Sequence, residues 1–176
     1  THIGVIPSDC KHPRYAVMQA ACAELSRYAD SIDAHFAVET GPEPAETLKN
    51  FLDSLGSHGV AVNLDPANFV MVTGDDPVRA VYSLRDYIVH THAKDGIKLA
   101  DGDPEAIYGV IEDVIQAGDY FRELPLGEGD VPFADYLHAL EDIGYLGFLT
   151  IEREVGENPA QDIALAIKFL HAQMGE

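Results

Sequence analysis

The chain has 176 residues, 47% of them hydrophobic, so it is long enough to bury one sizeable core. It carries 11 basic and 30 acidic residues, which gives a formal net charge of −19 at pH 7. This charge repels phosphate backbones and anionic lipid headgroups, so we expect neither a nucleic acid nor a membrane surface as partner.

The two cysteines, Cys10 and Cys22, do not form the CxxC spacing of a metal site, and two free thiols in a reducing compartment are expected. No apolar run approaches the ~20 residues that a membrane span requires, and no signal-peptide pattern opens the chain. A cytoplasmic protein is therefore predicted. The chain starts at Thr1 without a methionine and runs directly into an apolar segment, so we expect further residues upstream.

Short apolar runs alternate with segments of helical period, which predicts βα units and a parallel sheet. The expected strands cover residues 2–6, 34–39, 59–65, 87–92 and 147–152. The expected helices cover residues 13–31, 43–55, 77–84, 132–143 and 159–174. Residues 93–131 form a longer connection with an amphipathic stretch, Pro104–Gln116, and a loop, Leu124–Asp130. Because no segment has the composition of a linker, residues 1–176 are predicted to form a single domain.

Five βα units are fewer than a closed barrel requires. A complete (β/α)₈ barrel needs eight units and about 250 residues, so roughly three units are absent. The alternative is an open, doubly wound parallel sheet of five strands. A partial barrel exposes a sheet edge and the barrel interior, so we expect either a missing N-terminal barrel half or a second copy of the chain to cover them.

Four expected strands end in a side chain that can bind a metal. They are Glu39, Asp65, His92 and Glu152. Active sites form at the carboxyl ends of the strands in parallel α/β sheets and barrels, and these ends meet at one rim. The four side chains are therefore predicted to converge on a single cation.

Residues two positions apart in a strand share a face, so the residues behind the four ligands form a second layer. Asn63, His90 and Thr150 occupy three of the four places, in runs that are otherwise apolar. A polar layer under a metal is typical of the groups that orient its ligands.

Taken singly, each residue has a plainer interpretation. A strand-end acid is commonly a solvated turn residue, Asp65 before Pro66 can cap the following segment, and His90 alone suits a hydrogen-bonded core histidine. The remaining histidines lack the strand-end pattern and are expected at the surface or in packing. They are His2, His12, His35, His58, His138 and His171.

Three carboxylates and one imidazole form an oxygen-rich set of ligands. Such a set suits one divalent ion, Mn²⁺ or Mg²⁺, and would tolerate Co²⁺ or Zn²⁺. A structural zinc site is not expected, because no cysteine contributes a ligand.

Several segments resemble the xylose isomerase-like TIM-barrel superfamily, especially its sugar phosphate isomerase/epimerase branch. The resemblance rests on the segments 38–41, 63–68, 90–95, 125–129 and 150–152. It covers essentially the whole chain and implies an α/β fold of the (β/α)₈ TIM-barrel class, of which strands 4–8 are present.

The resemblance also implies a function. Members of the family hold a divalent metal with a Glu–Asp–His–Glu set, which falls here on Glu39, Asp65, His92 and Glu152. In the ketose 3-epimerases the two glutamates also move a proton next to a carbonyl, through an enediolate intermediate. A metal-dependent isomerase or epimerase of a small sugar or polyol is therefore expected, with Glu39 and Glu152 as catalytic residues.

Three substrate-binding positions depart from the epimerase pattern. Asn68 stands where these enzymes have a histidine, Lys98 stands where they have an arginine, and Glu43 is the candidate for a second substrate glutamate. Lys98 keeps the positive charge but lacks the bidentate fork of arginine. Hydroxypyruvate isomerase, inosose dehydratase and xylose isomerase-like activities therefore stay open, as does a sugar-binding barrel without catalysis.

The same fold also occurs in three-zinc abasic-site endonucleases. Those enzymes need an Asp-x-His pair where this chain has Phe121, Arg122 and Glu123, and a histidine where it has Asn68. Together with the charge of −19, these differences exclude a nuclease.

Overall fold

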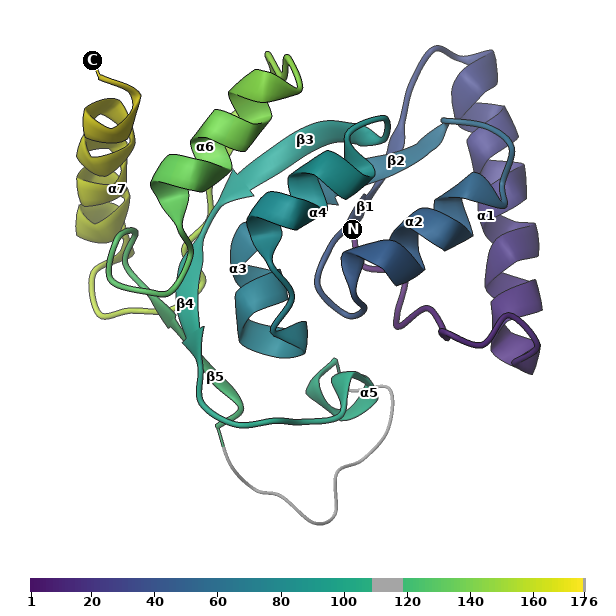
Figure 1. The fold of residues 1–176 in the computed structure, drawn as a ribbon, viewed down its shortest axis with the longest axis horizontal. Coiled ribbons are helices and arrows are strands. Elements are labelled where there is room, and N and C mark those ends of the chain that lie inside the picture. The colour runs from purple at the N-terminus through teal and green to yellow at the C-terminus, as the bar shows by residue number, and fades with distance from the viewer. Residues whose placement is uncertain (109–118, 176) are drawn as a thin grey trace.

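The computed structural model describes residues 1–108 and 119–175. Four parallel strands form one sheet in the order β1–β2–β3–β6. They are β1 (Phe36–Glu39), β2 (Val60–Leu64), β3 (Ile88–Ala93) and β6 (Leu149–Ile151). The helices are α1 (Pro13–Ser31), α2 (Ala45–Asp53), α3 (Pro66–Asn68), a π-helical turn (Phe69–Thr73), α4 (Pro77–Leu84), α5 (Pro104–Ile107), α6 (Phe133–Asp142) and α7 (Pro159–Met174). In Figure 1, α2, α4 and α6 lie in front of the sheet, between α1 at one end and α7 at the other.

The strand expected over residues 2–6 is wrong. Only Thr1 joins the sheet: its nitrogen donates to the Ala37 carbonyl, and the Glu39 nitrogen donates to the Thr1 carbonyl, both at 2.9 Å. Gly4 then adopts a φ of +84°, which an extended strand does not allow. Val5 and Ile6 are buried because they pack into the core. The parallel sheet of the described residues therefore has four strands instead of five.

The other expected strands and helices are found with shifts of at most a few residues at their ends. Local chemistry explains where the helices begin. At the start of α4 the Asp76 side chain accepts hydrogen bonds from the Val78 and Arg79 nitrogens, at 2.9 and 3.3 Å, and Pro77 occupies the first helical position. α4 thus starts at a residue that satisfies two of its free N–H groups, whereas α2 and α6 follow a proline that provides no side-chain cap.

The long connection between β3 and β6 contains a second sheet that the sequence did not predict. β4 (Asp95–Lys98) and β5 (Phe121–Leu124) pair antiparallel and extend from the end of β3. The predicted amphipathic stretch Pro104–Gln116 begins as α5, and its residues from 109 onward lie outside the described part of the chain.

The hydrophobic core lies between the sheet and the helices that follow its strands. Every residue of β2 is buried, as expected for a central strand of a parallel sheet. The largest fully buried side chains include Tyr136 of α6, Phe51 of α2 and Phe69. Cys10 is exposed, Cys22 is buried, and both are free thiols.

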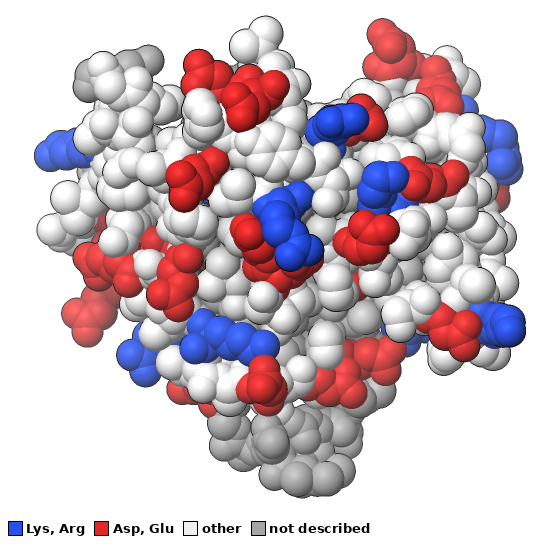
Figure 2. Space-filling view, in the orientation of Figure 1, with Lys and Arg blue, Asp and Glu red and all other residues white. Residues whose placement is uncertain are grey.

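The surface agrees with the acidic composition. Acidic side chains are spread over the face shown in Figure 2, and several of them lie beside the basic groups. Lys49 and Asp53, for example, form an ion pair of 2.6 Å along α2. Among the described residues, no helix combines the length and the apolar character needed to cross a membrane.

Candidate metal centre and cleft

The structure brings together the four strand-end side chains. Glu39 ends β1, Asp65 follows β2, His92 lies near the end of β3 and Glu152 follows β6. One ligand atom from each of the four lies within 4.8 Å of the others. The His92 Nδ1 atom is 3.1 Å from Asp65 Oδ2, 3.1 Å from Glu152 Oε2 and 3.9 Å from Glu39 Oε1. The carboxyl ends of the parallel strands thus form one cluster of ligands.

A β-bulge sets the direction of the His92 side chain. Val62 of β2 is opposite Ile88 of β3, but the next residue, Asn63, is opposite His90, so β3 carries one extra residue at this point. Bulges redirect the side chains that follow them. Beyond the bulge, His92 is opposite Thr150 of β6 and its ring faces the carboxylates.

The three polar residues predicted under the ligands contact one another or a ligand. The Asn63 amide lies 2.9 Å from His92 Nε2, and His90 Nε2 lies 2.8 Å from the Thr150 hydroxyl. Asn63 Oδ1 is buried and has no hydrogen-bond partner among the described residues. If His92 Nδ1 binds a cation, Nε2 carries the proton. A half-turn of the Asn63 amide would then let its free Oδ1 accept a hydrogen bond from Nε2–H. The surroundings of His92 therefore fit a metal ligand.

The electrostatics of the cluster point the same way. Burial opposes a charge on His92, but hydrogen bonds with Asp65 and Glu152 raise its pKa to about 10. The hydrogen bond with His92 lowers the pKa of Glu152 to about 2 against the effect of burial. Burial would raise the pKa of Glu39, but the hydrogen bond with His2 and nearby positive charges lower this pKa. The pKa of Asp65 is raised, because its carboxyl group is buried. The carboxylates therefore attract positive charge, which a divalent cation can supply in place of the His92 proton.

The predicted substrate-binding residues fall in different places. Asn68 is buried, and its amide nitrogen donates to Glu39 Oε1 at 3.1 Å and to the Thr40 carbonyl at 3.2 Å. Lys98 does not line the cleft and forms an ion pair of 2.8 Å with Asp101. Glu43 is also absent from the cleft wall: it is buried and accepts a hydrogen bond from the Ile6 nitrogen at 3.2 Å.

Sequence reasoning missed the group of charges around Lys94. Its ammonium lies 2.7 Å from Glu154, 3.1 Å from Glu152 and 3.8 Å from Glu123. Arg153 continues the group by donating to Glu123 at 2.9 Å. Lys94 stands two residues after His92, so the alternation that indicated His90 also pointed to it. Glu123 gave no such signal, because it reaches the site only through the unpredicted β4–β5 hairpin.

A cleft of about 220 Å³ opens onto the cluster. Its wall includes Glu39 and Glu152 from the cluster, Lys94, Tyr108 and His2. This cleft gives a small molecule access to the four ligands.

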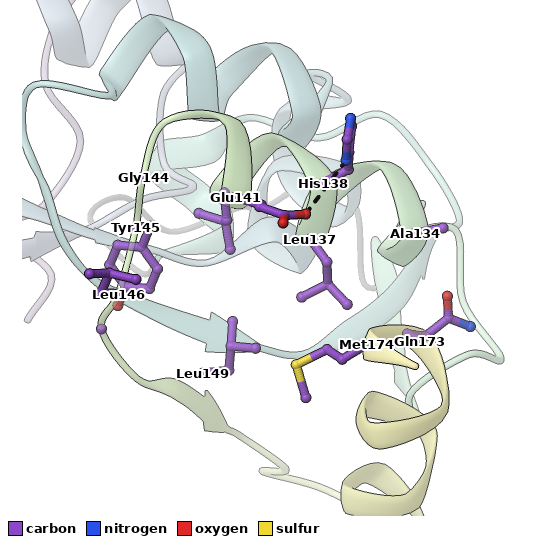
Figure 3. Close-up of a pocket in the computed structure, with 12 residues that line it drawn as sticks. Ala134, Leu137, His138, Glu141, Gly144, Tyr145, Leu146, Leu149, Gln173 and Met174 are labelled. Atoms are coloured by element: carbon purple, nitrogen blue, oxygen red, sulfur yellow. Dashed lines mark ion pairs between the residues drawn. The ribbon is translucent and has the colours of Figure 1, made fainter. Parts of the chain in front are cut away.

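A larger cavity of about 520 Å³ lies elsewhere, between α6 and the end of α7 (Figure 3). Leu137, Leu149 and Met174 point into it, while His138 and Glu141 lie 3.8 Å apart at its edge. None of the four cluster residues lines it. The smaller cleft is therefore the candidate site.

Comparison with known proteins agrees with this geometry. The sequence profile of the xylose isomerase-like TIM barrel matches residues 1–173. A xylose isomerase domain protein from Planctomyces limnophilus superposes with a TM-score of 0.78 at 30% identity, covering 98% of this chain and 56% of that one. A D-tagatose 3-epimerase-like protein gives 0.66 at 20% identity, covering 99% and 62%. A xylose isomerase-like protein from Mycobacterium smegmatis in complex with magnesium gives 0.65 at 16% identity, covering 96% and 55%.

None of the curated proteins matches the chain. The chain spans little more than half the length of the solved structures above. Its four parallel strands with their helices correspond to part of a barrel and not to a doubly wound sheet. This chain belongs to the xylose isomerase-like TIM-barrel family.

Proposed function

We propose that the protein is a divalent-metal-dependent isomerase or epimerase of a small sugar or polyol. The observation that supports this most directly is the convergence of Glu39, Asp65, His92 and Glu152 within 4.8 Å at the carboxyl ends of four parallel strands. Structural relatives include a D-tagatose 3-epimerase-like protein and a 3-keto-D-glucoside 4-epimerase from E. coli. An enzyme that acts on sugars is consistent with both findings.

In this proposal the four side chains hold one divalent ion, and His92 binds it through Nδ1. Mg²⁺ or Mn²⁺ is the best match for three carboxylates and one imidazole, and one relative was solved with magnesium. The ion would polarise the carbonyl group of the substrate and so make the neighbouring C–H more acidic.

Glu39 and Glu152 would move the proton. Glu39 ends β1 and Glu152 follows β6, the two edge strands of the four-stranded sheet, and both side chains line the cleft. The low pKa values of both groups keep them ionised at neutral pH, so either can accept a proton from the carbon next to the carbonyl. In an epimerisation, one carboxylate removes the proton from one face of the substrate and the other returns a proton to the opposite face.

Neighbouring groups would hold these carboxylates in place. Asn68 donates to Glu39 Oε1, and Lys94 donates to Glu152 Oε2 at 3.1 Å. In each case an oxygen is fixed by a buried donor, which limits rotation of the carboxylate. We propose this orienting role for Asn68 in place of the substrate contact that the sequence predicted.

Proton exchange in deuterated water tests the proposal. The Mn²⁺-loaded protein is incubated with a panel of small ketoses and aldoses, and deuterium at the carbon next to the carbonyl is followed by NMR. We expect Glu152→Gln to lower the exchange rate by a factor of about 10³ or more, because the carboxylate that accepts the proton is gone.

Glu141→Gln, on the exposed side of α6, is the matched control and should keep the parental rate. Metal titration of Glu152→Gln ensures that both proteins are compared when saturated with Mn²⁺. Full exchange in the saturated Glu152→Gln protein would refute the role of Glu152.

Dehydration of an inosose-type ring is the second candidate. Two structural relatives are a probable 3-DHS dehydratase from Bacillus anthracis and a mannonate dehydratase from Streptococcus suis. The first step would again be proton removal by a carboxylate, but hydroxide would then leave. An ultraviolet-absorbing enone product would favour this reaction, while exchange without absorbance favours epimerisation. A metal titration that finds no tight divalent site would favour a sugar-binding barrel without catalysis.

A further inference from the structure

We propose that His2 contacts the substrate, donating a hydrogen bond from Nε2 to a sugar oxygen on the Glu39 side of the cleft. This inference rests on the proposed function and adds a residue to it. The sequence placed His2 among the surface and packing histidines, at the start of an expected strand. The structure instead places it directly after Thr1, the one residue of this segment that pairs with β1.

The backbone shows how this happens. Thr1 pairs with β1 through its hydrogen bonds to Ala37 and Glu39, in the pattern of a parallel ladder. His2 is therefore the first residue beyond the point where the chain leaves the sheet, at the same rim as the end of β1. In parallel barrels this rim carries the functional side chains, while the opposite rim serves stability. His2 thus lies at the rim that holds the four ligands.

The contacts of His2 direct its ring into the cleft. Its Nε2 atom lies 3.4 Å from Glu39 Oε1, and its ring meets Tyr108 edge to face, with centroids 5.0 Å apart. His2, Glu39 and Tyr108 all line the cleft. Tyr108 therefore restrains the ring on one side while the imidazole edge faces the place where a substrate would approach Glu39.

His2 also has the accessibility that a substrate contact requires. Its side chain is 37% exposed, whereas the Lys94 side chain on the cleft wall is 5% exposed and held by Glu152 and Glu154. Glu39 Oε1 already accepts a shorter hydrogen bond, of 3.1 Å, from Asn68. His2 Nε2 can therefore donate to a sugar oxygen in place of Glu39 Oε1, because Asn68 still donates to Glu39 Oε1.

The first measurement does not require turnover. The Mg²⁺-loaded protein, with ¹⁵N-labelled histidine, is titrated with D-fructose, and the imidazole signals are assigned with His2→Gln and His35→Ala. The exposed His35 lies away from the cleft wall and serves as the control. We expect the His2 signal to shift with the sugar and the His35 signal to stay in place. A sugar that shifts the His92 signal but not that of His2 would overturn the inference.

The second measurement compares His2→Ala with His2→Gln in the proton-exchange assay. Loss of the donor should raise KM or lower kcat/KM by about tenfold in His2→Ala, while His2→Gln, which keeps an N–H donor, should stay within about threefold of the parent. Thermal stability and Mg²⁺ affinity should be unchanged in both.

Unchanged kinetics in His2→Ala would overturn the inference, as would a loss of Mg²⁺ affinity equal to that of Glu39→Gln, because His2 would then act only through Glu39. If the parent protein exchanges no proton with any sugar, the proposed reaction fails, and the histidine signals still decide whether His2 contacts a sugar.

Discussion

At the scale of single residues, Glu43 is a predicted substrate-binding residue that is buried away from the cleft wall. It is buried, and a backbone N–H, that of Ile6, donates to its carboxylate. Burial raises the pKa of Glu43 to about 7 from an ordinary value of 4.5, because the charged form is poorly solvated. Between these two pH values the folded chain binds more protons than the unfolded chain, so stability falls as the pH rises from about 4.5 to about 7.

Replacing Glu43 by Gln should remove this pH-dependent cost. The amide can still accept from Ile6 but never ionises, so we expect Glu43→Gln to be more stable than the parent by roughly 2–3 kcal/mol at pH 8 and nearly equal to it at pH 4. Urea unfolding at both pH values measures this, with Glu46→Gln, an exposed position three residues further along in α2, as control. An equal difference at both pH values, or a loss of stability at pH 8, would contradict the assignment.

The four candidate ligands were predictable because each follows an apolar run that has few alternatives to a buried strand. His2 and Lys98 were not, for two different physical reasons. The residues after His2 are apolar because they pack against the core. Hydrophobicity alone could therefore not show that pairing with β1 ends at Thr1. Lys98 follows His92 at the family's spacing, but the chain here enters β4, and the Lys98 ammonium forms an ion pair with Asp101 instead of lining the cleft.

At the scale of elements, the Asp95 carboxylate binds the loop after β5 to β4, beside a backbone hydrogen bond from the Asp130 nitrogen to the Gly96 carbonyl. Asp95 is fully buried, and its Oδ1 accepts from the Gly96 and Val131 nitrogens at 2.9 and 3.1 Å. Its Oδ2 accepts from the Gly127 and Gly129 nitrogens at 2.9 and 3.0 Å. No periodicity in the sequence reveals such a contact, since three of the four donors are backbone groups more than thirty residues away.

Asp95→Asn should therefore loosen this loop. Its NH₂ group must face two N–H donors in place of an acceptor, so we expect a loss of about 2–4 kcal/mol in unfolding free energy. Asp130→Asn, an exposed change in the same loop, is the control and should change stability little. Hydrogen exchange of the Gly127 and Gly129 amides locates the effect. Parental protection in Asp95→Asn would show that these hydrogen bonds do not hold the loop.

At the scale of the whole molecule, the apolar side chains beside β6, which pairs only with β3 in the part of the chain that the structure describes, are the main departure from an ordinary surface. Leu146 is 98% exposed and Phe148 is 78% exposed, next to the large cavity shown in Figure 3. An apolar area beside an unpaired strand edge favours association with other protein surfaces. The proposed missing barrel units, or a second copy of the chain, would cover it.

The isolated chain should accordingly self-associate at micromolar concentrations, and lysines at Leu146 and Phe148 should return it to a monomer. Sedimentation velocity over a range of concentrations measures this. Leu99→Lys is the matched control, because Leu99 is an exposed apolar residue beyond β4. A parent that is monomeric throughout, or a double variant that associates as strongly as the parent, would argue against this surface as the contact.

The pairing of β6 with β3 also has a consequence for the order of folding. Lys94 and Glu152 are 58 residues apart in sequence, and the β4–β5 hairpin and α6 lie between them. Such distant parallel pairings form slowly, since loop closure precedes any stabilising contact. Glu39, Asp65 and His92 can gather earlier, and Glu152 completes the set last. A chain in which β6 has not yet paired would have only three of the four ligands. Binding of the cation would therefore increase when β6 pairs with β3.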